Sequence, residues 1–293
     1  MADNGLVDGV IYYDADGVER RQKAHVVVLA CNGIGTPRTL LHSRSKNLPD
    51  GLANRSGLVG KNLMFDPFAM IGGMFEEPLE QYRGPQGCGV SSHEFYETDR
   101  QHDFVRGYSH EIARGWGRLP IAMWGLQSGR IPWGADHHRA CGEPFDHTAG
   151  MTSICEDLPE PRNCVTLDPD LRDSHGIPAP KVTYRLRENS INMLEHSVAR
   201  GREVMDAVGA HESISVSPWP DGGWHLMGTA RMGRDPRTSV VNEWGRSHDV
   251  HNLFIIDGSI FVTSAAVNPA NTIQALALYV ADAMKKNLAN LFD

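Results

Sequence analysis

The fold of this chain is decided by residues 224–284, WHLMGTARMGRDPRTSVVNEWGRSHDVHNLFIIDGSIFVTSAAVNPANTIQALALYVADAM. Within this stretch an apolar strand, residues 253–256, ends on Asp257 and Gly258. An Asp-Gly pair after a buried strand is typical of a tight turn, and because glycine has no side chain, such a turn can bring the backbone close to a ligand. We therefore expect a ligand-binding edge at Asp257 and Gly258.

A helix is predicted after this turn. Beyond Asn268 and Pro269, apolar residues recur every three or four positions and would form one helix face: Ile273, Leu276, Ala277, Val280 and Met284. Asn268, Pro269 and Asn271 are expected to form the start of this helix, because proline is favoured in a first helical turn. An Asn just before the proline can accept from the free N–H groups, so Asn268 is expected to cap the helix. The free N–H groups and partial positive charge of a helix start favour an electron-rich group in front of Asn268.

His225 and Asn268 are candidates for chemistry on a hydroxyl group. Both follow glycine-marked turns, so we expect them to meet at the mouth of one sheet. A histidine base and an amide that converge at a helix start can handle a hydroxyl group. Taken alone, each residue also has a structural interpretation: His225 as a hydrogen-bonded histidine at a sheet edge, Asn268 as a helix cap, and Asp257 as a turn residue.

Four ordered motifs in this stretch resemble the C-terminal part of the glucose-methanol-choline (GMC) oxidoreductases. They are His-x-x-Gly-Thr from His225, Val-Val-Asn from Val240, Asn-Leu-Phe-Ile-Ile-Asp-Gly-Ser from Asn252, and Asn-Pro-Ala-Asn-Thr-Ile-Gln-Ala-Leu-Ala from Asn268. Several ordered motifs over about sixty residues are far more specific than a lone glycine motif. Asn rather than His at position 268 is most similar to the pyranose oxidase and gluconate dehydrogenase branch.

The resemblance implies an FAD-dependent oxidoreductase that acts on CH–OH groups of a sugar, sugar acid or polyol. It implies hydride transfer to the flavin, with His225 as the base and Asn268 holding the substrate oxygen. It also places an Asp-Gly pair beside the ribityl and diphosphate part of FAD. The residues implied to bind the cofactor are Ala30, Gly33, Asp257, Gly258, Asn268 and Pro269.

The N-terminal residues are expected to belong to the same flavin domain. Strands are predicted at residues 10–13, 18–22 and 26–29, followed by a glycine-bearing loop at 30–35 and a helix that begins at Thr36-Pro37. We expect these strands to lie in one sheet with residues 253–257. Asn32 stands where the resembling family has Gly.

The fold class predicted is α/β, or α+β overall: the C-terminal part of an FAD-binding, Rossmann-like domain with an antiparallel-sheet substrate domain. The predicted domains are 1–65 and 223–293 for the flavin domain and 66–222 for the substrate domain. Periodicity is poor over residues 66–150, which we expect to form irregular lids or pocket walls. Farther on, a hairpin joining 151–157 to 164–168, a strand at 181–186 and a helix from Ile191 to Val208 are predicted, with the helix ending near Gly209.

Composition narrows the choice of partner. Acidic residues number 36 and basic residues 28, which gives a net charge of −8, and there is no basic run. Nucleic acid and anionic membranes are therefore disfavoured, and a small neutral or polar molecule, such as an alcohol or sugar, is expected. No apolar segment reaches the roughly twenty residues of a membrane helix, and no signal-peptide pattern is expected at residues 1–10. A subunit that accepts the electrons is a further expected partner.

Cysteine and histidine spacing points to neither a disulfide framework nor a metal site. The five cysteines are scattered, and we expect most of them to be small buried side chains. His137, His138, Cys141 and His147 match none of the familiar zinc spacings, so no metal is assigned.

One motif that the family needs is absent from these residues. No Gly-x-Gly-x-x-Gly follows a strand anywhere in the 293 residues, although this loop holds the FAD diphosphate at a helix N-terminus. We therefore expect the chain to correspond to the C-terminal half of a family member. The alternative is a non-catalytic remnant or binding subunit that has lost FAD. A nicotinamide dehydrogenase is less favoured, because it needs the same loop.

Overall fold

The computed structural model describes residues 5–287. Strand β3 (Val27–Leu29) pairs in parallel with β11 (Leu253–Ile255), with Val27 opposite Leu253 and Leu29 opposite Ile255. Two segments more than 220 residues apart therefore lie side by side, as the sequence predicts for residues 26–29 and 253–257. Apolar side chains of both strands join one core cluster with Leu40 and Val241.

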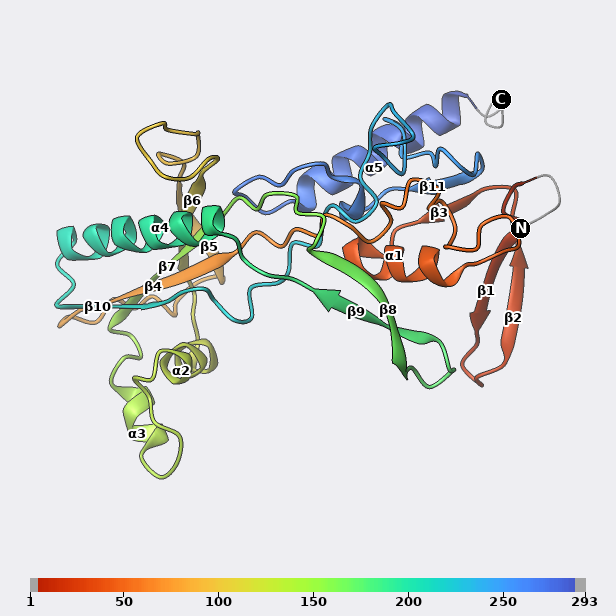
Figure 1. Cartoon of the computed structure of the whole chain (residues 1–293). Helices are drawn as coiled ribbons and strands as arrows, with labels where there is room; N and C mark the ends of the chain where they lie inside the picture. Colours follow the sequence, from red (N-terminus) through yellow and green to blue (C-terminus); the bar gives the residue numbers. More distant parts are fainter. Residues whose placement is uncertain (1–4, 288–293) are drawn as a thin grey trace.

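The first two strands form a separate sheet. β1 (Gly9–Tyr13) and β2 (Glu19–Lys23) pair only with each other, as an antiparallel hairpin closed by a turn in which Asp14 Oδ1 accepts from the backbone of Asp16 and Val18. The prediction that these strands share the sheet of β11 is therefore wrong. The charged sequence of β2 explains this, because all five of its side chains are exposed. In Figure 1 the hairpin projects at the right-hand end of the molecule.

The other end of the elongated molecule is built on a five-stranded antiparallel sheet (Figure 1). Its order is β10-β4-β7-β6-β5, and its strands are β4 (Phe68–Met74), β5 (Gly87–Ser92), β6 (Tyr108–Arg114), β7 (Thr148–Cys155) and β10 (Glu212–Val216). The antiparallel sheet is as predicted, but the expectation of irregular structure over residues 66–150 is wrong. All seven residues of β4 are buried, so the strand shows none of the alternation by which half-exposed strands are recognised.

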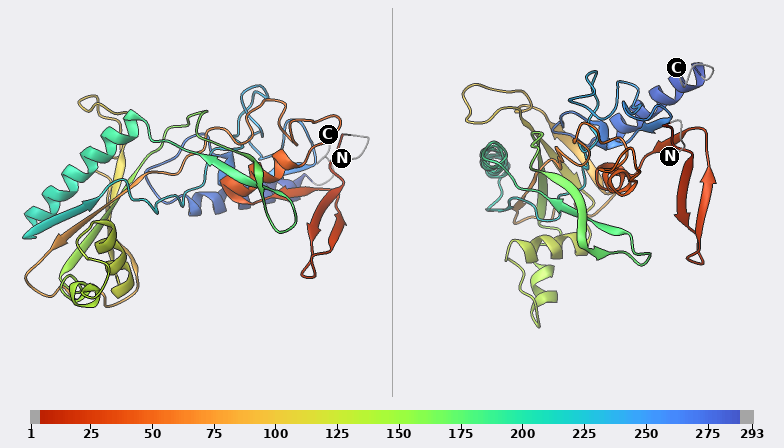
Figure 2. Two further views of the ribbon diagram at one scale, coloured as in Figure 1. Left: turned by 60° about the horizontal axis from the view of Figure 1, so that its bottom comes forward. Right: turned by 45° about the vertical axis from the view of Figure 1, so that its right-hand side comes forward.

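Helices cover both faces of this sheet. Two adjacent glycines of β4 show the arrangement: a Cβ on Gly72 would meet Trp124 of α2 (Arg118–Gln127), and a Cβ on Gly73 would meet Met205 of α4 (Glu188–Ala207). Figure 2 shows the two helices on opposite sides. Short helix α3 (His137–Gly142) follows α2. The helix predicted from residue 191 to 208 is α4, and Gly209 follows it in a left-handed conformation (φ 89°).

Strands β8 (Cys164–Arg172) and β9 (Pro178–Thr183) form a hairpin that packs on α1 (Asn32–His42). The predicted hairpin between residues 151–157 and 164–168 is therefore wrong, because β7 is inserted between β4 and β6. The strand predicted at 181–186 is β9, which begins and ends three residues earlier. Arg38 of α1 donates to the Pro178 carbonyl and to Asp173, which fixes the hairpin against the helix.

Helix α5 (Ala270–Lys286) has the predicted apolar face, with Val280 buried against Phe254 of β11. Within residues 5–287, none of the helices is long and apolar enough to span a membrane. The expectation that most cysteines are buried is wrong: Cys155 is buried, Cys31 and Cys88 are exposed, and Cys141 and Cys164 are partly buried; all five thiols are free. The predicted domain boundaries stay a prediction.

Candidate active site

His225 lies between an acid and an amide. Its Nδ1 is 3.0 Å from Asp66 Oδ2, and its Nε2 is 3.4 Å from Asn268 Nδ2. The imidazole is 7% exposed and Asp66 is fully buried, whereas Asn268 is exposed. One ring nitrogen is therefore fixed inside the protein, and the other faces an amide that solvent can reach.

Two short backbone segments hold the acid beside the histidine. Met64 and Met227 exchange two backbone hydrogen bonds of 3.1 Å, which places residues 64–66 alongside residues 225–227. Asp66 itself has a left-handed backbone (φ 56°) and precedes Pro67, so the chain turns sharply at this residue. Non-glycine residues adopt this conformation infrequently, and aspartate is among those that tolerate it.

Two further carboxyl groups, those of Asp157 and Glu111, lie near this contact. Burial raises the pKa of Asp66, while the hydrogen bond and the charge of His225 act in the opposite direction. Burial also raises the pKa of Asp157 to about 6, although that carboxylate accepts from the Tyr184 hydroxyl at 2.7 Å and from the Phe65 amide at 3.1 Å. From β6, Glu111 is close enough to His225 for the two charges to interact.

The start of α5 differs from its predicted form. The N-cap residue is Pro269, and no side chain caps the helix. Asn268 does not act as the expected cap, because its amide turns toward His225 instead. The first N–H groups of a helix have no partners within the helix, so the start of α5 presents free donors next to His225.

Aromatic side chains line the region beside the histidine. The Phe68 ring centroid lies 5.2 Å from that of His225 and 5.4 Å from that of Trp224. Phe68 is buried, whereas Trp224 is 65% exposed. A large exposed indole directly before His225 offers an apolar surface at the approach to the site.

Asp257 is bonded to the start of α1. Its Oδ2 accepts from the Thr36 hydroxyl at 2.5 Å and from the Asn32 amide at 3.1 Å, and its Oδ1 accepts from the Ser259 amide. Helix α1 begins at Asn32, four residues before the predicted start at Thr36-Pro37, so residues 32–35 are not a loop. The backbone of Asn32 is left-handed (φ 64°), a conformation that glycine adopts readily, which accounts for the Gly expected at this position. The Asn32 Oδ1 accepts from the backbone amides of residues 34 and 35.

Gly33 and Gly258 both approach the carbonyl of Leu226. A Cβ on Gly33 would lie 2.7 Å from the Leu226 carbonyl oxygen, and a Cβ on Gly258 would lie 2.5 Å from it. The close approach expected at Gly258 is thus made by the chain itself. These glycines position the residue that follows His225, and Ala30 lies exposed just before α1. A role for Ala30, Gly33, Asp257, Gly258, Asn268 and Pro269 in cofactor binding stays a prediction.

Asp66 is the residue that the sequence analysis missed. It lies in an Asp-Pro pair, where a lone acid has the appearance of a turn residue. Neither its burial nor its partner 159 residues away is visible in a local pattern. Within residues 5–287, no group of three or more His, Cys, Asp or Glu side chains could hold a metal ion.

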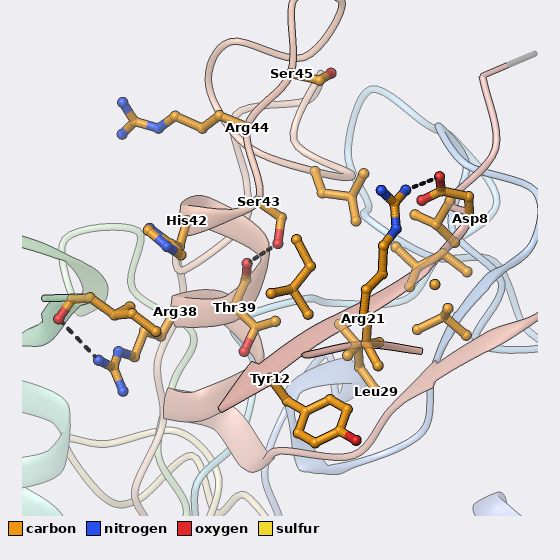
Figure 3. Close-up of a pocket in the computed structure, with 18 of the residues that line it drawn as sticks. Asp8, Tyr12, Arg21, Leu29, Arg38, Thr39, His42, Ser43, Arg44 and Ser45 are labelled. Carbon is orange, nitrogen blue, oxygen red and sulfur yellow. Dashed lines mark hydrogen bonds and ion pairs between the residues drawn. The ribbon is translucent and has the colours of Figure 1, made fainter. Parts of the chain in front are cut away.

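A cavity of about 870 Å³ lies away from His225, between β1, β3 and α1. Figure 3 shows Arg21 and Arg38 on its walls, paired with Asp8 and with the β8–β9 hairpin respectively. No predicted site residue lines it.

Comparison with known proteins identifies the relatives of this chain. Residues 159–277 match the C-terminal domain of the family described as GMC oxidoreductase. The 2-methyl-1,2-propanediol dehydrogenase of Mycolicibacterium austroafricanum is 42% identical over 99% of this chain and 53% of its own length. The fructose dehydrogenase large subunit of Gluconobacter japonicus is 32% identical over 96% and 51%, and the gluconate 2-dehydrogenase flavoprotein of Pantoea cypripedii is 25% identical over 97% and 48%.

A solved structure shows the same fold. Pyridoxine 4-oxidase from Mesorbium loti superposes with a TM-score of 0.63 at 16% identity, covering 97% of this chain and 56% of that chain. The chain spans about half the length of the curated relatives named here. The resemblance drawn from the sequence motifs is confirmed: the chain belongs to the GMC oxidoreductases, whose C-terminal domain it carries at residues 159–277.

Proposed function

We propose that this chain supplies the substrate-oxidising part of an FAD-dependent oxidoreductase that acts on CH–OH groups. The observation that carries the proposal is the position of His225, held by buried Asp66 on one ring nitrogen and facing Asn268 with the other. A structural histidine at a sheet edge does not need both contacts. A catalytic base needs one ring nitrogen held by the protein and the other nitrogen turned toward a group that can bind the substrate.

The residues present fit one end of FAD better than the other. The uncapped start of α5 offers free N–H donors beside His225, which suits an electron-rich edge of a flavin ring. The start of α1 does not offer the same free N–H donors, because Asp257 and the Asn32 side chain already accept hydrogen bonds from its backbone amides. The diphosphate therefore needs a glycine loop that these 293 residues do not contain.

FAD, when bound, supplies a hydride acceptor for the substrate C–H bond. His225 accepts the hydroxyl proton at Nε2, since Nδ1–H donates to Asp66 and leaves the lone pair on Nε2. Asn268 Nδ2 donates to the substrate oxygen and orients the adjacent C–H bond. The carboxylate of Asp66 fixes the tautomer and stabilises the imidazolium that forms, which makes Asp66 a positioning residue.

The names of the relatives support a small polyhydroxy or diol substrate. They include dehydrogenases of 2-methyl-1,2-propanediol, fructose and gluconate. We propose that this chain acts on a sugar, sugar acid or polyol of the same chemical class. Because one relative is a large subunit, an electron-accepting partner subunit is part of the proposal.

The second candidate function is a non-catalytic remnant or binding subunit without FAD. It is favoured by one observation, the absence of Gly-x-Gly-x-x-Gly from the 293 residues. The two functions differ in the visible spectrum of a chimera that joins this chain to the part of the 2-methyl-1,2-propanediol dehydrogenase that the chain does not cover.

We expect the 293-residue chain alone to purify without tightly bound flavin and the chimera to carry one FAD that diols or sugars bleach anaerobically. A chimera that folds but binds no FAD, or whose bound FAD is bleached by no member of a panel of diols, sugars and sugar acids, would favour the non-catalytic alternative.

A further inference from the structure

A second cavity lies on the opposite side of the five-stranded sheet from His225. Helix α4 packs mainly on β4 and β7, and between α4 and edge strand β5 a groove of about 390 Å³ remains. Its side chains come from β5, β6, β7 and α4, and from Glu94 and Phe95 in the segment that follows β5. Its apolar lining includes Val90, Ile112, Met151 and Val204.

The groove is separate from the candidate active site. His110 lines it, whereas the next residue of β6, Glu111, interacts with His225. Successive residues of a strand point to opposite faces of a sheet. A ligand in the groove would therefore be separated from His225 by the sheet itself.

His110 has an unsatisfied nitrogen at the base of this groove. The side chain is 4% exposed, and its Nδ1 is 3.0 Å from the Ser153 hydroxyl. Its Nε2 is buried and has no hydrogen-bond partner among residues 5–287. Leaving a buried polar atom without a partner costs free energy, and most such atoms in proteins are paired with protein, water or a ligand.

The charges around the groove favour an uncharged occupant. Arg200 at the rim pairs with Glu203 at 2.6 Å, although its Nε has no hydrogen-bond partner among residues 5–287. Glu94 adds a second carboxylate to the lining, so an anion gains no net attraction from these charges. Burial lowers the pKa of His110 to about 4, which leaves the imidazole neutral at pH 7. An ion placed at the base of the groove would lack a countercharge.

We propose that this groove is a second binding site, which takes an uncharged molecule with an apolar body and one hydroxyl group bonded to His110 Nε2. A hydroxyl both donates and accepts, so it satisfies Nε2 in either tautomer that the Ser153 contact allows. The apolar body contacts Val90, Ile112, Met151 and Val204. This inference does not rest on the proposed oxidoreductase activity.

Fluorine NMR titration of the 293-residue chain tests the proposal, with 4-fluorophenol as the probe and fluorobenzene as its match without a hydroxyl. We expect saturable binding of 4-fluorophenol and weaker binding of fluorobenzene by roughly 3- to 10-fold, the usual effect of one hydrogen bond. His110→Phe should weaken 4-fluorophenol by a similar factor and leave fluorobenzene unchanged.

Two further variants locate the probe. Val204→Trp should abolish binding because it fills the groove, while Ile191→Trp, another partly exposed position on α4, should not change it. His225→Phe should also leave binding unchanged, since the probe is not in the candidate active site. Absence of saturable binding, equal affinity for the two probes, or binding that survives both Val204→Trp and His110→Phe would overturn the proposal and leave water as the occupant of the groove.

Discussion

Replacing Asp66 with Asn removes the negative charge behind His225 and keeps the size of the side chain. In the proposed reaction His225 becomes positively charged when it accepts the hydroxyl proton. Asp66 Oδ2 lies 3.0 Å from Nδ1 and is fully buried, so no solvent screens this contact. The substitution should therefore slow the step in which the charge develops.

The size of the effect follows from the type of hydrogen bond. A charge-assisted bond contributes about 1.5–3 kcal/mol and a neutral one about 0.5–1.5 kcal/mol, so the loss is about 1–2 kcal/mol. Since about 1.4 kcal/mol corresponds to a tenfold change in rate, flavin reduction should slow by about 5- to 30-fold. The loss is larger if the new amide nitrogen faces Nδ1, because His225 is then held in the wrong tautomer.

Anaerobic stopped-flow reduction of the chimera measures this step without an electron acceptor. Asp235→Asn is the matched control, since Asp235 pairs with Arg237 at the surface. We expect the control to reduce its flavin at the parental rate. An Asp66→Asn chimera that binds FAD and is reduced as fast as the control would refute the role given to the carboxylate.

Three further substitutions probe the site. Asn268→Ala should slow flavin reduction less than loss of the base does, because the pocket still orients the substrate; a loss as large as that of a base variant would contradict this. Gly33→Ala should cost about 1–3 kcal/mol in urea unfolding, because its Cβ would lie 2.7 Å from the Leu226 carbonyl, whereas Gly142→Ala meets open space and should not destabilise the chain. In the parent, burial raises the pKa of Asp157 to about 6, so as the pH rises from about 4 to about 6 the folded state keeps a proton that the unfolded state has released, and stability falls by about 3 kcal/mol. Asp157→Asn should remove this fall in stability. Equal stability of Gly33→Ala and Gly142→Ala, or an unchanged pH profile for Asp157→Asn, would contradict these assignments.

The sequence predicted the parts of the fold that carry strong local or family signals. The apolar runs at residues 26–29 and 253–256 indicated strands of one parallel sheet, and they pair as β3 and β11. The burial expected of both strands holds for β11, whereas Val28 of β3 is 43% exposed. The helix after Pro269 was visible from its apolar spacing. His225 and Asn268 were expected to meet because both follow glycine-marked turns, and their side chains lie 3.4 Å apart.

The parts that the sequence did not predict depend on distant contacts. β4 is buried at every residue, so its pattern does not alternate, and β7 joins β4 and β6 although a turn signal follows it. Asn268 resembles a helix cap in every local respect, yet its amide turns to His225. Asp66 gives no local sign of its function, because the function comes from a partner 159 residues away.

The most direct test of the proposed function is flavin reduction in a His225→Ala chimera. If His225 is the base, the variant should bind FAD as the parent does, while reduction by the alcohol slows by roughly 10²- to 10⁴-fold, the usual loss when a positioned base is removed. The measurement is anaerobic stopped-flow absorbance from pH 6 to pH 8. Reduction of the His225→Ala flavin at the parental rate across that range would show that the histidine is structural.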